Sequence, residues 1–68
     1  MSRSMIEQML INTFNYYVME CGKGQWAYER LNYNVFVKYK ELFDQLSEEE
    51  QWEVRTVMEA IKQIHGNN

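Results

Sequence analysis

Few side chains in this sequence could do covalent or metal chemistry, and their spacing fits no catalytic or zinc-binding arrangement. Cys21 is the only cysteine and His65 the only histidine among the 68 residues. A lone cysteine cannot form an internal disulfide, and one cysteine with one histidine cannot supply the ligands of a structural zinc site. The same pair is weak evidence for a nucleophile and its base. We interpret Cys21 as a core thiol at a helix end and His65 as a C-terminal helix cap or a partner of the helix dipole.

The remaining candidate groups have simpler structural explanations. The carboxylates are concentrated in Glu48-Glu49-Glu50, a run that suits the positive end of a helix dipole and needs no acid–base role. Gly22-x-Gly24 lacks the rest of any phosphate-binding fingerprint and is typical of a turn. The sequence therefore predicts a protein that is not an enzyme and that holds neither a cofactor nor a metal ion.

The chain length bounds the architecture. Sixty-eight residues allow a single domain, residues 1–68, and so short a chain buries only about 60% of the surface that its unfolded form exposes. The net stability of such small scaffolds is close to zero without disulfides, a metal, very regular helices or self-association. Because the composition excludes the first two, we expect regular helices and a homodimer.

The charge balance disfavours nucleic acid and membrane partners. Seven basic and ten acidic residues give a net charge of −3, which does not favour binding to phosphate groups of DNA or of an anionic membrane. The first residues lack the apolar run of a signal peptide, and no stretch approaches the ~18 apolar residues of a membrane span. We therefore expect a cytoplasmic protein, and the unpaired Cys21 agrees with a reducing compartment.

Capping signals mark the first and the last helix. Ser4-x-x-Glu7 and Ser47-x-x-Glu50 both fit the capping box, in which the serine oxygen and the glutamate carboxylate each accept a hydrogen bond from the other residue's backbone N–H. After each serine, apolar residues recur at steps of three and four: Ile6, Met9, Leu10, Phe14, Tyr17 and Cys21, then Val54, Val57, Met58, Ile61 and His65. Gly22 and Gly66 follow these runs as helix stops. The sequence predicts helices near 4–21 and 47–65.

The segment between them, LNYNVFVKYK at 31–40, fits two structures. With a period of two, apolar residues alternate and many are aromatic or β-branched, as in a strand. With a period of 3.6, one helix face carries Tyr28, Leu31, Val35, Tyr39, Leu42 and Leu46, with Phe36 and Phe43 at its edge. A strand would need a partner strand from a second copy, because no other segment has strand character. The helix needs none, so we favour a helix near 25–46 and an all-α, three-helix bundle.

A helical middle segment leaves large apolar residues outside the core. At 100° per residue, Trp26, Tyr33 and Val37 lie opposite the core face of that helix. Trp52 lies across from the apolar stripe of the last helix, where it either folds back over the first turn or stays available to a partner. The first helix is apolar nearly all round. We predict Trp26, Tyr33, Val37 and Trp52 as the partner-binding residues.

Composition indicates a class of function rather than a specific activity. Ten aromatic residues and five methionines are typical of adaptable protein interfaces. We predict a small non-enzymatic protein that acts by binding another protein, as an adaptor or an inhibitor. Short acidic chains of this kind are common among phage and mobile-element proteins, which suggests a viral origin by class alone. The alternative is a small dimeric nucleic-acid-associated regulator, because basic, amide and aromatic residues interleave between Lys23 and Lys40.

Overall fold

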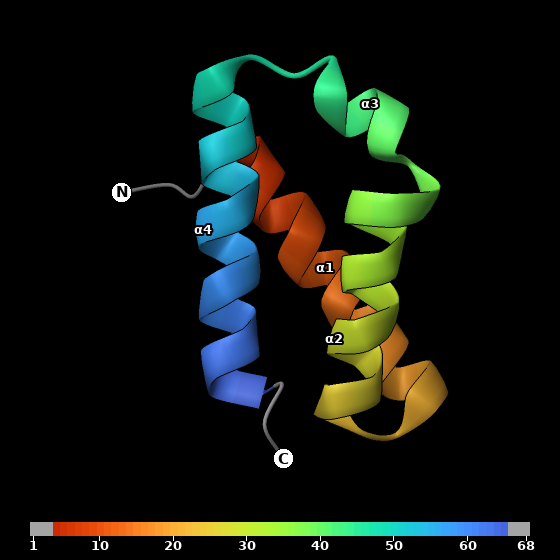
Figure 1. The fold of residues 1–68 in the computed structure, drawn as a ribbon. Coiled ribbons are helices and arrows are strands. Elements are labelled where there is room, and N and C mark those ends of the chain that lie inside the picture. The colour runs from red at the N-terminus through yellow and green to blue at the C-terminus, as the bar shows by residue number, and fades with distance from the viewer. Residues whose placement is uncertain (1–3, 66–68) are drawn as a thin grey trace.

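The structure, a computed structural model, describes residues 4–65 and is all-helical. In chain order the elements are α1 (Met5–Cys21), α2 (Gly24–Tyr33), the π-helical turn η1 (Asn34–Lys38), α3 (Lys40–Asp44) and α4 (Glu48–His65) (Figure 1). No strand occurs among residues 4–65, so the helical prediction for 31–40 is confirmed and the strand alternative is wrong. The expected stop at Gly66 lies outside the described residues.

The two capping boxes start the long outer helices, as the sequence predicts. The Ser4 hydroxyl accepts from the Glu7 N–H at 3.1 Å, and it also donates to the Glu53 carboxylate, which ties the start of α1 to α4. The second box is fully reciprocal. The Glu50 N–H donates to the Ser47 hydroxyl at 3.2 Å, and the Ser47 N–H donates to the Glu50 carboxylate at 3.1 Å. These local bonds satisfy N–H groups that have no partner within the helix.

Glycines shape the turn after α1. Gly22 adopts a left-handed conformation with φ of 79°, and its N–H donates to the Val18 carbonyl at 2.7 Å, which ends α1. Gly24 is needed for a different reason, because a Cβ there would lie 2.9 Å from the His65 carbonyl oxygen. The end of α4 therefore packs directly on the start of α2. Beside this contact the His65 ring packs against Phe14, with ring centroids 5.1 Å apart.

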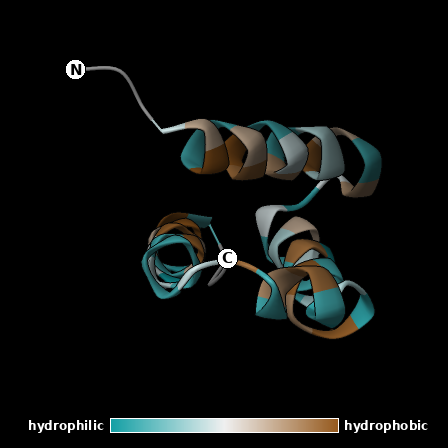
Figure 2. Cartoon of the chain, turned by 90° about the horizontal axis from the view of Figure 1, so that it is seen from above, coloured by the Kyte–Doolittle hydropathy of each residue, from teal (hydrophilic) through white to brown (hydrophobic). Residues whose placement is uncertain are grey.

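The core lies where α1 crosses over α2 and α4 (Figures 1 and 2). Figure 2 shows hydrophobic residues on the inward sides of these helices and hydrophilic residues on the outward sides of α2 and α4. The buried residues are Leu10 and Phe14 of α1, Ala27 and Leu31 of α2, Phe43 of α3, and Val54, Val57, Met58 and Ile61 of α4. No polar or charged residue between 4 and 65 is buried. Burial of these apolar side chains is the main stabilising contribution.

The prediction of one continuous helix over 25–46 is wrong. After α2 the chain widens into η1, where the Tyr39 N–H donates to the Asn34 carbonyl, five residues back, at 3.0 Å. Tyr39 then leaves the helical region, with φ of −111° and ψ of 33°, and α3 begins in a new direction. A π turn accommodates one extra residue, so the core face after it is shifted by one position. Phe43 is buried, whereas Tyr39 and Leu42, predicted for the core face, are exposed.

Contacts across the fold account for this irregular segment. The Phe36 ring packs edge-on against Phe43 with 5.2 Å between centroids, which the extra residue of η1 makes possible. At the other end of α3, the side-chain amide of Gln51 in α4 donates to the carbonyls of Phe43 and Leu46 at 3.1 and 3.2 Å. The Phe43 carbonyl also accepts from the Leu46 N–H at 3.1 Å, so Gln51 adds a second bond there, caps the end of α3 and fastens it to α4.

Candidate functional site

Three of the four predicted partner-binding residues lie on the outer side of α2 and η1. Trp26, Tyr33 and Val37 are each more than half exposed, as the helical period predicts. The Lys23 ammonium lies 5.0 Å from the centre of the Trp26 ring. That these three residues bind a partner stays a prediction.

Trp52, the fourth, lies on a different element and does not join them. It lies on the first half of α4, and 68% of it is exposed, so it is not folded back into a covered position. The structure therefore places the predicted residues on two separate elements. None of the four lines a further, apolar depression of the described surface.

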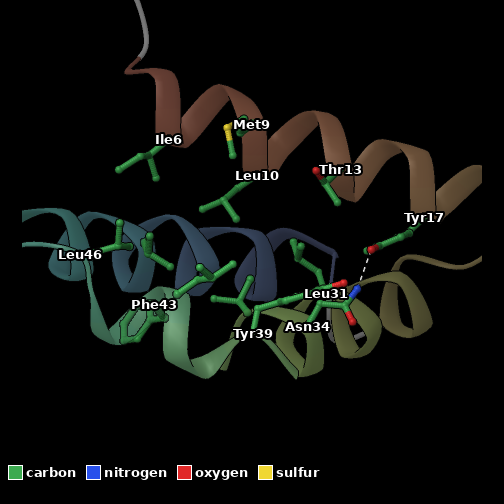
Figure 3. A pocket seen from close by; sticks show the side chains of 13 residues that line it. Ile6, Met9, Leu10, Thr13, Tyr17, Leu31, Asn34, Tyr39, Phe43 and Leu46 are labelled. Carbon is green, nitrogen blue, oxygen red and sulfur yellow. Dashed lines mark hydrogen bonds between the residues drawn. The ribbon is translucent and has the colours of Figure 1, made fainter. Parts of the chain in front are cut away.

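That depression is a groove between α1 and the opposing segment η1–α3, with a volume of about 460 Å³ (Figure 3). Its 13 lining residues are Ile6, Met9, Leu10, Thr13, Tyr17, Leu31, Asn34, Val35, Tyr39, Leu42, Phe43, Leu46 and Val54. Eleven of them, all except Thr13 and Asn34, are apolar or aromatic. Figure 3 shows Ile6 and Leu10 pointing from α1 toward the side of Phe43. We refer to this depression as the groove.

The groove exists because the helices pack closely only at one end of the fold. α1, α2 and α4 pack on one another, whereas α3 packs on η1. The break at Tyr39 turns α3 out of line with α2, so the first half of α1 faces α3 across open space. Apolar side chains of both elements line that space rather than closing it.

The groove has a buried floor and exposed lips. Leu10, Leu31, Phe43 and Val54 form the floor, and each is buried in the core. The lips are Met9 on α1 and Tyr39 and Leu42 on the opposite side, and these three side chains are about half exposed or more. The lips can therefore be changed without removing core packing, which separates binding from folding in an experiment.

Polar and cationic groups lie at the edges of the groove. At one end the Asn34 amide donates to the Tyr17 hydroxyl at 2.6 Å, and both residues line the groove. The Arg30 guanidinium lies 5.1 Å from the centre of the Tyr17 ring. The Lys38 ammonium lies 5.3 Å from the centre of the Tyr39 ring. A cationic side chain therefore lies over the ring of each of these two groove-lining tyrosines.

The described part of the chain brings few reactive groups together. Between residues 4 and 65, no group of three or more His, Cys, Asp or Glu residues is placed to hold a metal ion. Cys21 is a free, half-buried thiol. Burial raises the pKa of the Tyr28 phenol, and the nearby Glu59 carboxylate raises that pKa further. A hydrogen bond to Glu20, at 2.8 Å, raises the pKa of the exposed Tyr16 phenol.

Comparison with known proteins adds no functional assignment. The chain matches no protein-family model, no curated protein and no solved structure. Across residues 4–65, none of the helices has the length and apolar character needed to cross a membrane. The geometry of the surface is therefore the basis for a functional proposal.

Sequence reasoning found the exposed aromatic residues but missed the groove. The helical period assigns Leu42 and Tyr39 to a closed core, whereas the structure places both at an open lip. The groove depends on the π turn and on the break at Tyr39, and neither has a signature in the hydrophobic period. The cluster of β-branched and aromatic residues at 35–37, a weak helix former, is the signal that marks the irregular segment.

Proposed function

We propose that this protein acts without catalysis by binding another protein, as a homodimeric adaptor or inhibitor, and that the groove receives an amphipathic helix of that partner. The observation that carries the proposal is an open, apolar groove of about 460 Å³ on a chain of only 68 residues. Monomeric proteins seldom leave such an apolar surface uncovered unless something binds there.

The dimensions of the groove suit a short helix. Its volume lies within the ~300–1,000 Å³ typical of sites that bury a ligand. Along α1 the lining runs from Ile6 to Tyr17, and 11 steps of 1.5 Å give a length of about 16 Å, or three helical turns. Helix-in-groove recognition uses apolar anchors at positions i, i+3 or i+4, and i+7, which span about 11 Å and fit within that length.

The composition of the lips suits a partner that adjusts on binding. Met9 and Leu42 line opposite walls of the groove and are both mostly exposed, and Met9 has a flexible thioether side chain. Methionine-lined grooves adapt to different apolar anchors because the unbranched side chain changes rotamer at low cost. The polar pair Asn34–Tyr17 at one end provides hydrogen-bonding groups that can fix the orientation of a bound helix.

The cations at the edges of the groove indicate which charges the partner helix carries beside its apolar face. Arg30 and Lys38 lie over groove-lining tyrosine rings. Lys40, the next cation along the chain, forms an ion pair with Asp44 at 2.7 Å. A partner helix with acidic residues beside its apolar face would pair with Arg30 and Lys38, which would orient the helix and favour encounter.

The proposal is tested by capture from the native cells with three versions of the protein. Leu42→Glu places a charge on an exposed lip and leaves the floor intact, so we expect it to fold and to lose the partner. The matched control is Tyr33→Glu/Val37→Glu, which places charges on the outer face of α2 and η1. Proteins bound to wild type and to the control, but absent from Leu42→Glu, are the expected result.

Two outcomes contradict the proposal. The first is a partner that all three versions capture equally, since that partner binds elsewhere. The second is a partner lost from Tyr33→Glu/Val37→Glu and kept by Leu42→Glu, which would assign binding to the residues predicted from sequence. Circular dichroism of each version establishes that the fold is retained.

A further inference from the structure

One face of α1 carries a stripe of exposed, uncharged residues. Its residues are Met5, Met9, Asn12, Tyr16 and Met19, which follow one another at steps of four and three. All five are exposed, Met5 by 80% and Met19 by 85%. Steps of four and three keep side chains on one line along a helix, which is the spacing of the contact seam of paired helices. We call this line the α1 stripe.

The α1 stripe differs from the rest of the surface in its lack of charge. From Gln8 to Met19 the helix contains no acidic or basic residue, although a quarter of the chain is charged. The exposed face of α4, by contrast, carries Glu48, Glu59 and Lys62. Because the chain has a net charge of −3, two copies repel each other unless they meet at a face free of like charges. The α1 stripe is such a face.

The stripe has a methionine at each end and an asparagine at its centre. Met5 and Met19 each lie seven residues from Asn12, one before it and one after it. A two-fold axis through Asn12 would therefore place Met5 of one copy against Met19 of the other and bring the two Asn12 side chains together. An asparagine amide carries both donors and acceptors, so two of them can hydrogen-bond to each other. Symmetric dimers require this kind of self-complementary surface.

We propose that the α1 stripe pairs antiparallel with the same stripe of a second copy, about a two-fold axis near Asn12. The inference identifies the interface of the homodimer and rests on that part of the proposed function. Met9 belongs both to the α1 stripe and to a lip of the groove, so the dimer is tested at Met5 and Met19, which do not line the groove. It places the dimer contact on α1, apart from Tyr33 and Val37, which the sequence predicts as partner-binding residues. From Met5 to Met19 the α1 stripe spans 15 residues and is only about 21 Å long, so the dimer should dissociate in the micromolar range rather than be permanent.

Sedimentation equilibrium over low to high micromolar concentrations tests the pairing and its direction. Wild type should pass from monomer to dimer. Met5→Glu/Met19→Glu should weaken dimerisation at least about tenfold, because antiparallel pairing would set like charges together. Met5→Glu/Met19→Lys should restore it, since each glutamate would then meet a lysine of the other copy. Both altered positions are exposed, so the variants should keep the helical spectrum.

Cysteine cross-linking gives an independent measure in a Cys21→Ser background. Asn12→Cys should oxidise readily to a disulfide dimer, whereas Met19→Cys should not, because position 19 would face position 5 of the other copy. Cross-linking of Met19→Cys would contradict antiparallel pairing. So would equal weakening of dimerisation by Met5→Glu/Met19→Glu and by Met5→Glu/Met19→Lys. A dimer lost in Tyr33→Glu/Val37→Glu and kept in Met5→Glu/Met19→Glu would contradict the α1 stripe as the interface, although the protein would still be a homodimer. A wild type that stays monomeric would overturn both, without affecting binding at the groove.

Discussion

Phe43 and Leu42 are adjacent in α3, and the structure predicts very different costs for replacing each with alanine. Phe43 is 8% exposed and packs edge-on against Phe36, so Phe43→Ala should cost about 3 kcal/mol, the lower part of the range for buried aromatics. Leu42 is 61% exposed, so about two-fifths of its surface is covered. Burial of a whole leucine contributes roughly 1.5–3 kcal/mol, so Leu42→Ala should cost about 1 kcal/mol or less.

Urea unfolding followed by circular dichroism measures both costs. A chain of 68 residues is expected to have roughly 3–10 kcal/mol of stability in total, so Phe43→Ala should remove about a third of it or more. Adding the osmolyte TMAO to every sample keeps the variant in a measurable range. The wild type and Leu42→Ala, measured in the same buffer, provide the reference and the matched control.

The comparison decides whether the π turn exists. A regular helix over 25–46 would place Leu42 on the core face and Phe43 at its edge, so Leu42→Ala would then be the more costly change. If Leu42→Ala costs as much as Phe43→Ala, or more, the one-residue shift at η1 is refuted. The groove would then be refuted as well, because its open lip contains Leu42.

Three further predictions follow from local features. Ser47→Ala should lower the free energy of unfolding by about 1 kcal/mol, because it removes the reciprocal cap with Glu50. Ser47→Asp should retain most of the stability that the cap contributes, and urea unfolding measures both variants. The raised pKa of Tyr28 means that the folded state holds the phenol proton more tightly than the unfolded state does. The stability that this proton contributes is therefore complete below the ordinary tyrosine pKa and is lost as the pH rises through the pKa of the folded state. Tyr28→Phe should lessen the loss of stability between about pH 9 and pH 12, measured by urea unfolding at each pH. With a net charge of −3, the protein should show no salt-sensitive binding to DNA or RNA in gel shifts at low salt.

The helix ends could be predicted because their causes are local. Ser4 and Ser47 accept bonds from N–H groups three residues away, and Gly22 adopts the left-handed conformation that ends α1. Each signal lies within a few residues of the boundary it sets. The outward direction of Trp26 and Tyr33 could be predicted for the same reason, because both belong to the regular helix α2.

The groove could not be predicted, because it depends on contacts between distant residues. Asn34 bonds to Tyr17, which is 17 residues earlier, and Gln51 of α4 caps the end of α3. These contacts favour the π turn and the new direction of α3, and neither contact is visible in a hydrophobic period. Val37 belongs to η1, where the period of 3.6 no longer holds, so its exposure followed from the sequence less securely than that of Trp26.

The central claim is that the groove binds an amphipathic helix with acidic flanks, and a titration followed by nuclear magnetic resonance tests it most directly. The probe is a synthetic helical peptide of about four turns, with leucines along one face and glutamates beside them; a second peptide replaces the glutamates with lysines. We expect the acidic peptide to shift the amide signals of Met9, Tyr39 and Leu42, to bind more tightly than the basic peptide, and to bind Leu42→Glu much more weakly. Absence of shifts at these residues, or shifts centred on Trp26 and Tyr33 instead, would contradict the account.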